Sequence, residues 1–296
     1  MNQGSRCPSQ LAVITGTTHG IGKVTSRELA RAGRTVVMLC RDGNAANSVR
    51  NEILEQAPGA SIHVVPCDLA SLASVRNAAA TVIRDFGRID LLVNNAGMTT
   101  TAHRMSADGF ELTFATNHLG PFLLTSLLFE RLSETARIVN VASRAHLRSR
   151  QLDLSAVTDR RARYSAIGAY AQSKLANIMF TFALARRLSG TRICVNCLHP
   201  GVVASNLLPW WLRLVKPLLS RVIFDVERGA RTTLYLSLSD DVAGHSGRYY
   251  DENSVPVAAS ALANDVQLQE SLWTHSSQWV AAAPGELQCH PTSVRK

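Results

Sequence analysis

The chain of 296 residues is long enough for one large domain or two small ones, and its hydrophobic content of 46% is that of a globular protein with a sizeable core. The formal net charge of +9 is spread along the sequence, with short clusters at residues 144–150 and 160–163. This distribution indicates a solvated basic surface and no nucleic-acid partner, because nucleic-acid-binding proteins concentrate such charge. Attraction to a phosphorylated cofactor or to an anionic membrane surface stays open.

The predicted elements alternate between strands and helices. Strands are expected at 11–15, 35–40, 61–66, 90–94, 136–142 and 192–198, and helices at 21–32, 45–56, 72–86, 109–132 and 167–188. The strands are continuously apolar, which predicts an α/β protein: a single-domain Rossmann fold with a doubly wound parallel sheet and helices on both faces. We expect this domain to span residues 11–280, between a flexible N-terminus (1–10) and a flexible C-terminal tail (281–296).

The six cysteines mostly lie within apolar runs, as buried free thiols do. No apolar signal segment follows Met1, so we expect a cytoplasmic protein without disulfides. Cys194 and Cys197 have the spacing of metal ligands, but residues three apart on a strand point to opposite faces. No second ligand pair completes the set, so we expect no metal site.

A glycine-rich turn, residues 15–22, joins the first predicted strand to the first helix. Glycines allow the backbone to approach a pyrophosphate, which the helix N-terminus stabilises through free N–H groups. A purely structural turn is the alternative, but the strand-turn-helix context favours a nicotinamide dinucleotide. The candidate contacts here are Gly16, Thr18, His19, Gly20, Ile21 and Gly22.

The turns after the next strands add further candidates. Arg41 follows the second strand and carries a donor fork suited to a 2′-phosphate, which favours NADP(H) over NAD(H). Asp42 is either a ribose ligand or a turn residue before the next helix. The turns after the third and fourth strands supply Asp68, Leu69, Asn94, Ala96 and Gly97 as further cofactor contacts.

Tyr170 and Lys174 lie four residues apart in a predicted helix and therefore share one of its faces. An ammonium beside the phenol would lower the pKa of Tyr170 and suit it to acid/base catalysis. Alone, the pair is also explained as two surface residues at helical spacing. Ser143, directly after a predicted strand, and Asn117, in the preceding helix, favour the catalytic interpretation.

Taken in order, these motifs resemble the short-chain dehydrogenase/reductase (SDR) family from about Leu11 to Tyr250. The segments at 20–23, 40–42, 117–120, 143–146, 173–177 and 199–203 resemble its retinol dehydrogenase-like branch, which commonly uses NADP(H). Thr18 and His19 depart from that branch, where Asn and a small residue are common. We expect packing or surface roles, not metal binding, for His118, His146 and His199.

The resemblance implies roles for the matched residues. Tyr170 would be the general acid/base, and Ser143 would orient and polarise the substrate oxygen. Lys174 would bind the nicotinamide ribose and tune Tyr170, and Asn117 would support a water-linked proton relay. The segment containing Pro200, Gly201, Val203 and Ser205 would approach the carboxamide group of the nicotinamide.

An aromatic and aliphatic segment at about 205–226 is interpreted as a substrate lid that suits a lipophilic alcohol, aldehyde or ketone. A subunit interface in a homo-oligomer and shallow membrane contact through Trp210 and Trp211 remain alternatives. No apolar anchor precedes Leu11, which weakens the case for a retinoid substrate. A ketoreductase of secondary metabolism and a nucleotide-sensing or scaffold protein are the competing functions.

Overall fold

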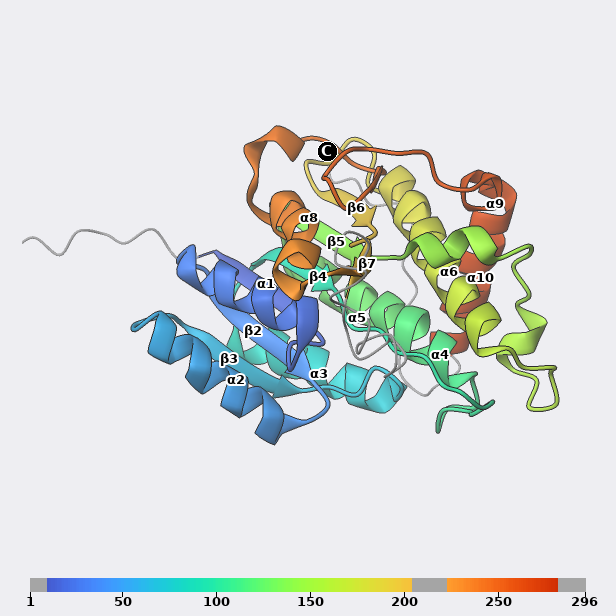
Figure 1. The fold of residues 1–296 in the computed structure, drawn as a ribbon, viewed down its shortest axis with the longest axis horizontal. Coiled ribbons are helices and arrows are strands. Elements are labelled where there is room, and N and C mark those ends of the chain that lie inside the picture. Colours follow the sequence, from blue (N-terminus) through green and yellow to red (C-terminus); the bar gives the residue numbers. More distant parts are fainter. Residues whose placement is uncertain (1–9, 204–222, 282–296) are drawn as a thin grey trace, which may run out of the picture.

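The computed structural model describes residues 10–203 and 223–281 (Figure 1). Its main sheet has seven strands in the order β3-β2-β1-β4-β5-β6-β9, and all neighbouring pairs are parallel. The strands are β1 (Leu11–Thr15), β2 (Thr35–Cys40), β3 (Ile62–Pro66), β4 (Ile89–Asn94), β5 (Leu132–Val141), β6 (Cys194–Leu198) and β9 (Tyr249–Tyr250). The direction of strand progression reverses between β1 and β4, and ligands of such folds bind at the carboxyl ends of the strands there.

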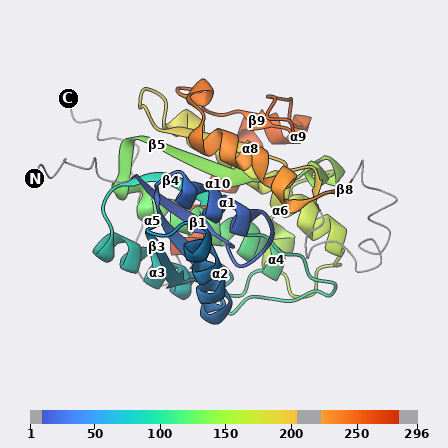
Figure 2. The same ribbon diagram turned by 60° about the vertical axis from the view of Figure 1, so that its left-hand side comes forward.

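Helices cover both faces of the sheet (Figures 1 and 2). One buried cluster holds side chains of α1 (Gly20–Arg31), α2 (Gly43–Gln56) and α8 (Val226–Leu238). The other holds side chains of α3 (Leu72–Asp85), α5 (Gly120–Leu128), α6 (Ala166–Arg187) and α10 (Val266–Ala281). Each fully buried aliphatic side chain, such as Leu29, contributes roughly 1.5–3 kcal/mol. The predicted doubly wound Rossmann fold is confirmed.

The single helix predicted at 109–132 is wrong. The segment is divided into α4 (Leu112–Phe114), a π-helix η1 (Ala115–Leu119), α5 and a 3₁₀ turn η2 (Phe129–Arg131), and β5 already begins at Leu132. Gly109 has a φ of +84° and lies outside the helix. Pro121 has no N–H to donate to the carbonyl of Asn117 four residues earlier, so a regular α-helix cannot continue through this turn. The wider π-turn falls on Asn117, and such turns are common at functional sites.

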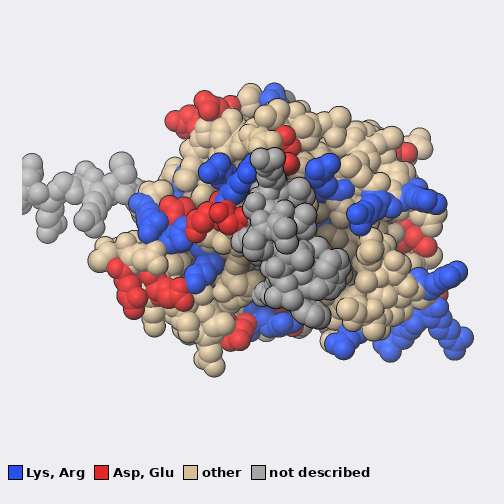
Figure 3. Space-filling model, in the orientation of Figure 1, with Lys and Arg blue, Asp and Glu red and all other residues tan. Residues whose placement is uncertain are grey.

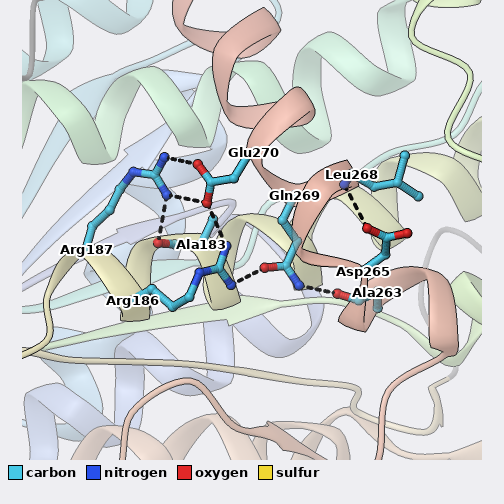
Figure 4. A network of polar contacts seen from close by, with 8 residues as sticks. All are labelled: Ala183, Arg186, Arg187, Ala263, Asp265, Leu268, Gln269 and Glu270. Atoms are coloured by element: carbon cyan, nitrogen blue, oxygen red, sulfur yellow. Dashed lines mark hydrogen bonds and ion pairs between the residues drawn. The ribbon is translucent and has the colours of Figure 1, made fainter.

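The C-terminal elements lie beyond the last strand predicted from periodicity. They are α8, a 3₁₀ turn η5 (Asp240–Val242), β9, α9 (Ala261–Asn264) and α10. Figure 4 shows how α10 is fixed to α6: the carboxylate of Glu270 pairs with Arg187 and lies 2.7 Å from Arg186 Nη2. Ala281 ends α10, so the first residue of the predicted tail is helical, while 282–296 and 1–9 lie outside the described residues.

Charged side chains are distributed over the surface. On the face in Figure 3, Lys and Arg lie in separate groups, several of them beside acidic side chains, and do not form one continuous basic area. Within the described parts of the chain, no helix has the length and apolar character needed to cross a membrane.

Candidate active site

The glycine-rich turn after β1 is packed so tightly at Gly16 and Gly22 that side chains would not fit there. A Cβ on Gly16, whose φ is +70°, would lie 2.7 Å from the Cα of Ala96. A Cβ on Gly22 would lie 2.1 Å from the carbonyl oxygen of Gly16. Asn95, which the sequence analysis did not select, holds this turn by donating from Nδ2 to the carbonyls of Thr15 (2.9 Å) and Gly16 (3.0 Å). The sequence Asn-Asn-Ala-Gly at residues 94–97, which contains Asn95 between predicted cofactor contacts, is the signal for that role.

The N-terminus of α1 is open to an anion. His19 occupies the N-cap position but makes no capping hydrogen bond, and its Nδ1 instead lies 3.0 Å from the hydroxyl of Thr18. The first N–H groups, including those of Gly20 and Ile21, therefore receive no side-chain cap. Unsatisfied N–H groups and the helix dipole favour a bound anion, so this turn fits the pyrophosphate of a nicotinamide cofactor.

At the end of β2, the structure distinguishes Asp42 from Arg41, the two residues predicted to contact the ribose of the cofactor or its 2′-phosphate. Asp42 is the N-cap of α2, and its Oδ1 accepts a hydrogen bond from the backbone N–H of Ala45 at 3.0 Å. Arg41 is exposed, and no hydrogen bond or ion pair joins it to another described residue. The turn-residue interpretation of Asp42 therefore fits the structure, and Arg41 remains available to a ligand.

The turns after β3 and β4 contain further residues that were predicted to contact the cofactor. Asp68 Oδ1 accepts from the N–H of Ala70 at 3.0 Å, and the Leu69 carbonyl lies where a Cβ on Gly120 would be only 2.4 Å away. Asn94 points into the core, where its Nδ2 donates to Thr125 (3.1 Å) and Asn140 (2.8 Å). The amide hydrogens of Asn94 are thus used inside the protein, and its Oδ1 is buried without a partner among the described residues.

Tyr170 and Lys174 share one face of α6, as their spacing predicts. The ammonium of Lys174 lies 5.7 Å from the centroid of the Tyr170 ring. Lys174 is only 2% exposed, and its Nζ donates to the carbonyl oxygen of Val141 at the end of β5 at 2.8 Å. A buried ammonium with one fixed partner is held in place and keeps further hydrogens for a ligand.

Gly97 lies next to the side chains of both Lys174 and Asn117, and its lack of a side chain leaves room for them. A Cβ there would lie 3.2 Å from Lys174 Nζ and 3.7 Å from Asn117 Oδ1. Asn117 Nδ2 donates to the Met98 carbonyl and to the Ser173 hydroxyl, both at 2.9 Å. That hydroxyl in turn donates to the Tyr170 carbonyl at 2.8 Å. Ser173 was not predicted as a site residue, although it directly precedes Lys174 in the Tyr-x-x-x-Lys motif.

Ser143 caps the short 3₁₀ helix η3 (Arg144–Arg148), its hydroxyl oxygen accepting from the N–H of Ala145 at 3.1 Å. Ser143 also acts on the phenol of Tyr170, whose pKa it lowers through a side-chain hydrogen bond. The structure therefore brings Asn117, Ser143, Tyr170 and Lys174 into one cluster next to Gly97.

The expected lowering of the Tyr170 pKa by Lys174 is wrong for this structure. Burial raises the pKa of Tyr170, and the hydrogen bond from Ser143 offsets part of that shift. Burial also lowers the pKa of Lys174 to about 8. Removing either group from water disfavours its charged form, and burial is the largest cause of both pKa shifts.

The segment after β6 is only partly described. Gly201 has a φ of +75°, and Val203 is buried in β7 (Val202–Val203), which pairs with β8 (Ile223–Phe224). Ser205 and residues 205–222 of the predicted lid lie outside the described residues, whereas 223–226 belong to β8 and the start of α8. Leu147, Ile167 and Val202 are exposed apolar residues that lie within four residues of Ser143, Tyr170 or Gly201 in sequence.

No group of three or more His, Cys, Asp or Glu side chains that could hold a metal ion occurs among the described residues. Cys194 and Cys197 are both buried free thiols.

Comparisons with known proteins agree with this geometry. The sequence profile described as short chain dehydrogenase matches residues 10–209. Human retinol dehydrogenase 13 is 35% identical over 293 residues, which cover 94% of this chain and 88% of the relative. A crystal structure of an uncharacterized protein from Mycobacterium paratuberculosis is 34% identical, with a TM-score of 0.76 and coverage of 92% of this chain and 95% of that chain.

A second solved structure is a blue fluorescent protein from a metagenomic library in complex with NADPH. It is 25% identical, has a TM-score of 0.67, and the match covers 82% of this chain and 95% of that one. The glycine turn, the four-residue cluster and these matches lead to one conclusion. The chain belongs to the short-chain dehydrogenase family and is an NAD(P)-dependent oxidoreductase of the retinol dehydrogenase-like kind.

Proposed function

We propose that the protein transfers hydride reversibly between NADP(H) and a lipophilic alcohol, aldehyde or ketone, with Tyr170 as the general acid/base. The observation that carries the proposal is the cluster of Tyr170, Ser143 and Lys174 beside the glycine turn. A protein that only bound a nucleotide would have no use for a phenol hydrogen-bonded to a serine at this position.

The cofactor would be held by residues on both sides of the switch point. The N-terminus of α1 suits the pyrophosphate, Arg41 suits a 2′-phosphate, and the buried ammonium of Lys174 suits the nicotinamide ribose. The NADPH complex of a structural neighbour supports a phosphorylated cofactor. When bound, the cofactor supplies or accepts the hydride.

Tyr170 moves the proton at the substrate oxygen. In reduction, the carbonyl carbon gains the hydride while the phenol donates its proton to the carbonyl oxygen. Ser143 holds its hydroxyl beside the phenol, so it can donate a hydrogen bond to the same oxygen. Lys174 places a positive charge near the phenolate that forms, and Asn117 supports a water-linked route for the returning proton.

A lipophilic substrate is supported by two observations. Leu147, Ile167 and Val202 expose apolar side chains and lie close in sequence to Ser143, Tyr170 and Gly201, and exposed apolar surface of this kind favours an apolar ligand. A relative of similar length is named retinol dehydrogenase 13, and retinol is a long apolar alcohol.

The direct test is cofactor consumption by the purified full-length protein, with NADPH and NADH in parallel, across aldehydes and ketones of increasing apolar length. We expect NADPH-dependent reduction whose kcat/KM rises with apolar length, because each added buried CH₂ contributes about 0.8 kcal/mol. Equal rates with short polar carbonyls would contradict the substrate class. Preference for NADH would contradict the cofactor choice, and binding of NADPH without any turnover would favour a nucleotide sensor.

A further inference from the structure

His146 lies three residues after Ser143, on η3, and is only 1% exposed. Both of its ring nitrogens have partners. Nδ1 lies 2.8 Å from the carbonyl oxygen of Ser143, and Nε2 lies 3.3 Å from the backbone nitrogen of Ser260. The imidazole therefore connects the catalytic serine to a segment more than a hundred residues away.

The two hydrogen-bond partners determine which ring nitrogen of His146 carries the hydrogen. A backbone N–H only donates, so Nε2 must accept from Ser260 and carry no hydrogen. The hydrogen is then on Nδ1, which donates to the Ser143 carbonyl. Burial lowers the pKa of His146, in agreement with this neutral form. A neutral imidazole with one donor and one acceptor satisfies both neighbours at once.

The distal partner is itself held firmly. The hydroxyl of Ser260 caps α9 by accepting from the N–H of Ala263 at 3.2 Å. Gln269 Nε2 donates to the Ala263 carbonyl at 2.6 Å, and the adjacent Glu270 pairs with arginines of α6 (Figure 4). Because α6 also carries Tyr170, the segment that contacts His146 is fixed to the helix of the catalytic phenol.

Aromatic packing holds the imidazole from the side. The ring of Tyr249 on β9 lies edge-to-face with His146, with centroids 5.2 Å apart. Tyr249 also contacts His199, which directly precedes Pro200 and is paired with Glu252 at 2.8 Å. His146 is thus confined between the Ser143 turn and the last strand of the sheet.

We infer that His146 is a positioning residue, which fixes the backbone of Ser143 so that the serine hydroxyl stays aligned with Tyr170. The carbonyl and the hydroxyl of Ser143 are separated only by the rotatable Cα–C and Cα–Cβ bonds, so a shift of the backbone at the carbonyl is transmitted to the hydroxyl. The inference rests on the function proposed for Ser143. It adds a residue that touches neither substrate nor cofactor and that works through a backbone carbonyl.

Three variants test this role. His146→Leu removes both hydrogen bonds, and we expect kcat to fall roughly 10- to 100-fold with little change in the dissociation constant of NADPH, because small misplacements of a catalytic group are costly. His146→Asn retains an amide N–H at about the position of Nδ1, so it should recover most of the lost kcat. His275→Leu is the matched control, since His275 Nδ1 also bonds a backbone carbonyl, that of Ser271 at 2.8 Å, but in α10.

A double-mutant cycle decides between positioning and general structural support. In the Ser143→Ala background, His146→Leu should lower kcat by less than about twofold further, because the hydroxyl it aligns is already gone. A full second loss of activity would overturn the inference, as would an His146→Asn enzyme no better than His146→Leu. Thermal unfolding and NADPH binding of each variant show that the compared proteins are folded.

The same cycle separates this inference from the proposed function. If Ser143→Ala retains full activity, the role of Ser143 fails and the inference fails with it. If Ser143→Ala is impaired but His146→Leu adds its full effect, the proposed function stands and only the positioning role is overturned.

Discussion

The glycine turn at 15–22 and the cluster around Tyr170 lie at the same carboxyl edge of the sheet, but they are built differently. In the turn, missing side chains shape the site: a Cβ on Gly16 or Gly22 would overlap the backbone. In the cluster, buried and half-buried side chains of three separate segments are held by hydrogen bonds. The glycine spacing of the turn is visible in the local sequence, although Ala96 and Asn95 pack against the turn from far along the chain, whereas the cluster is formed only by long-range packing.

This contrast predicts that changes in the cluster affect turnover and changes in the turn affect cofactor binding. The largest effect is expected for Tyr170→Phe, which removes the transferable proton and keeps the ring. Loss of a general acid lowers kcat by roughly 10²- to 10⁴-fold, while the dissociation constant of NADPH should stay within about twofold. Steady-state kinetics and fluorescence titration with NADPH measure the two. Tyr235→Phe on α8 is the matched control, and retained activity in Tyr170→Phe would contradict the assignment.

The reverse pattern is expected for Gly22→Ala. The added Cβ would lie 2.1 Å from the Gly16 carbonyl, and relieving such overlap typically costs about 1–3 kcal/mol, or roughly 5- to 150-fold in the dissociation constant of NADPH. Gly87→Ala is the control, because a Cβ there has no neighbour within 4 Å. Unchanged NADPH affinity in Gly22→Ala would remove the turn from the cofactor site.

A smaller effect is expected at the end of β2. Arg41→Gln removes a charge that no described residue neutralises, and the preference for NADPH over NADH should fall about tenfold, the size of one charge-assisted hydrogen bond. The ratio of kcat/KM for the two cofactors measures this preference. NADH kinetics serve as the internal control, since only the 2′-phosphate distinguishes the cofactors. A constant ratio would assign the phosphate to another residue.

The smallest effect concerns stability and leaves the glycine turn untouched. His118 on η1 is fully buried, and burial lowers its pKa to about 3. As the pH falls below the ordinary histidine pKa of about 6.5, the unfolded chain takes up a proton that the folded protein does not, so stability falls by up to about 1.4 kcal/mol per pH unit. His118→Gln should flatten this slope in urea unfolding between about pH 7 and pH 5. An unchanged slope would show that His118 is not the group responsible.

Sequence periodicity predicts six of the seven main-sheet strands within a few residues, because most of them are apolar runs buried between two layers; β3 and the first half of β5 are more exposed. It fails where long-range contacts decide. The break at Asn117 arises from Pro121 together with bonds to Met98, and β9 is only two residues long and exists through pairing with β6. Segments this short contain too few residues to show the periodic pattern of apolar residues by which a helix or strand is predicted.

The residues of the candidate site also divide into those that the local sequence predicts and those that long-range contacts determine. The glycine turn and the Tyr-x-x-x-Lys spacing are local, so their residues could be selected from the sequence. The contributions of Val141, Ser173 and His146 depend on backbone carbonyls or on partners far along the chain. The direction of the Tyr170 pKa shift was also beyond reach, because the depth of burial of the phenol and the ammonium is set by the fold.

Isotope transfer tests the central claim most directly. The full-length protein would be incubated with a long-chain apolar aldehyde and NADPH carrying deuterium at the transferable position of the nicotinamide, and the alcohol would be analysed by mass spectrometry. The account predicts one deuterium bound to the former carbonyl carbon in the wild type and almost no product with Tyr170→Phe. Alcohol without deuterium, or labelled alcohol formed equally well by Tyr170→Phe, would contradict it.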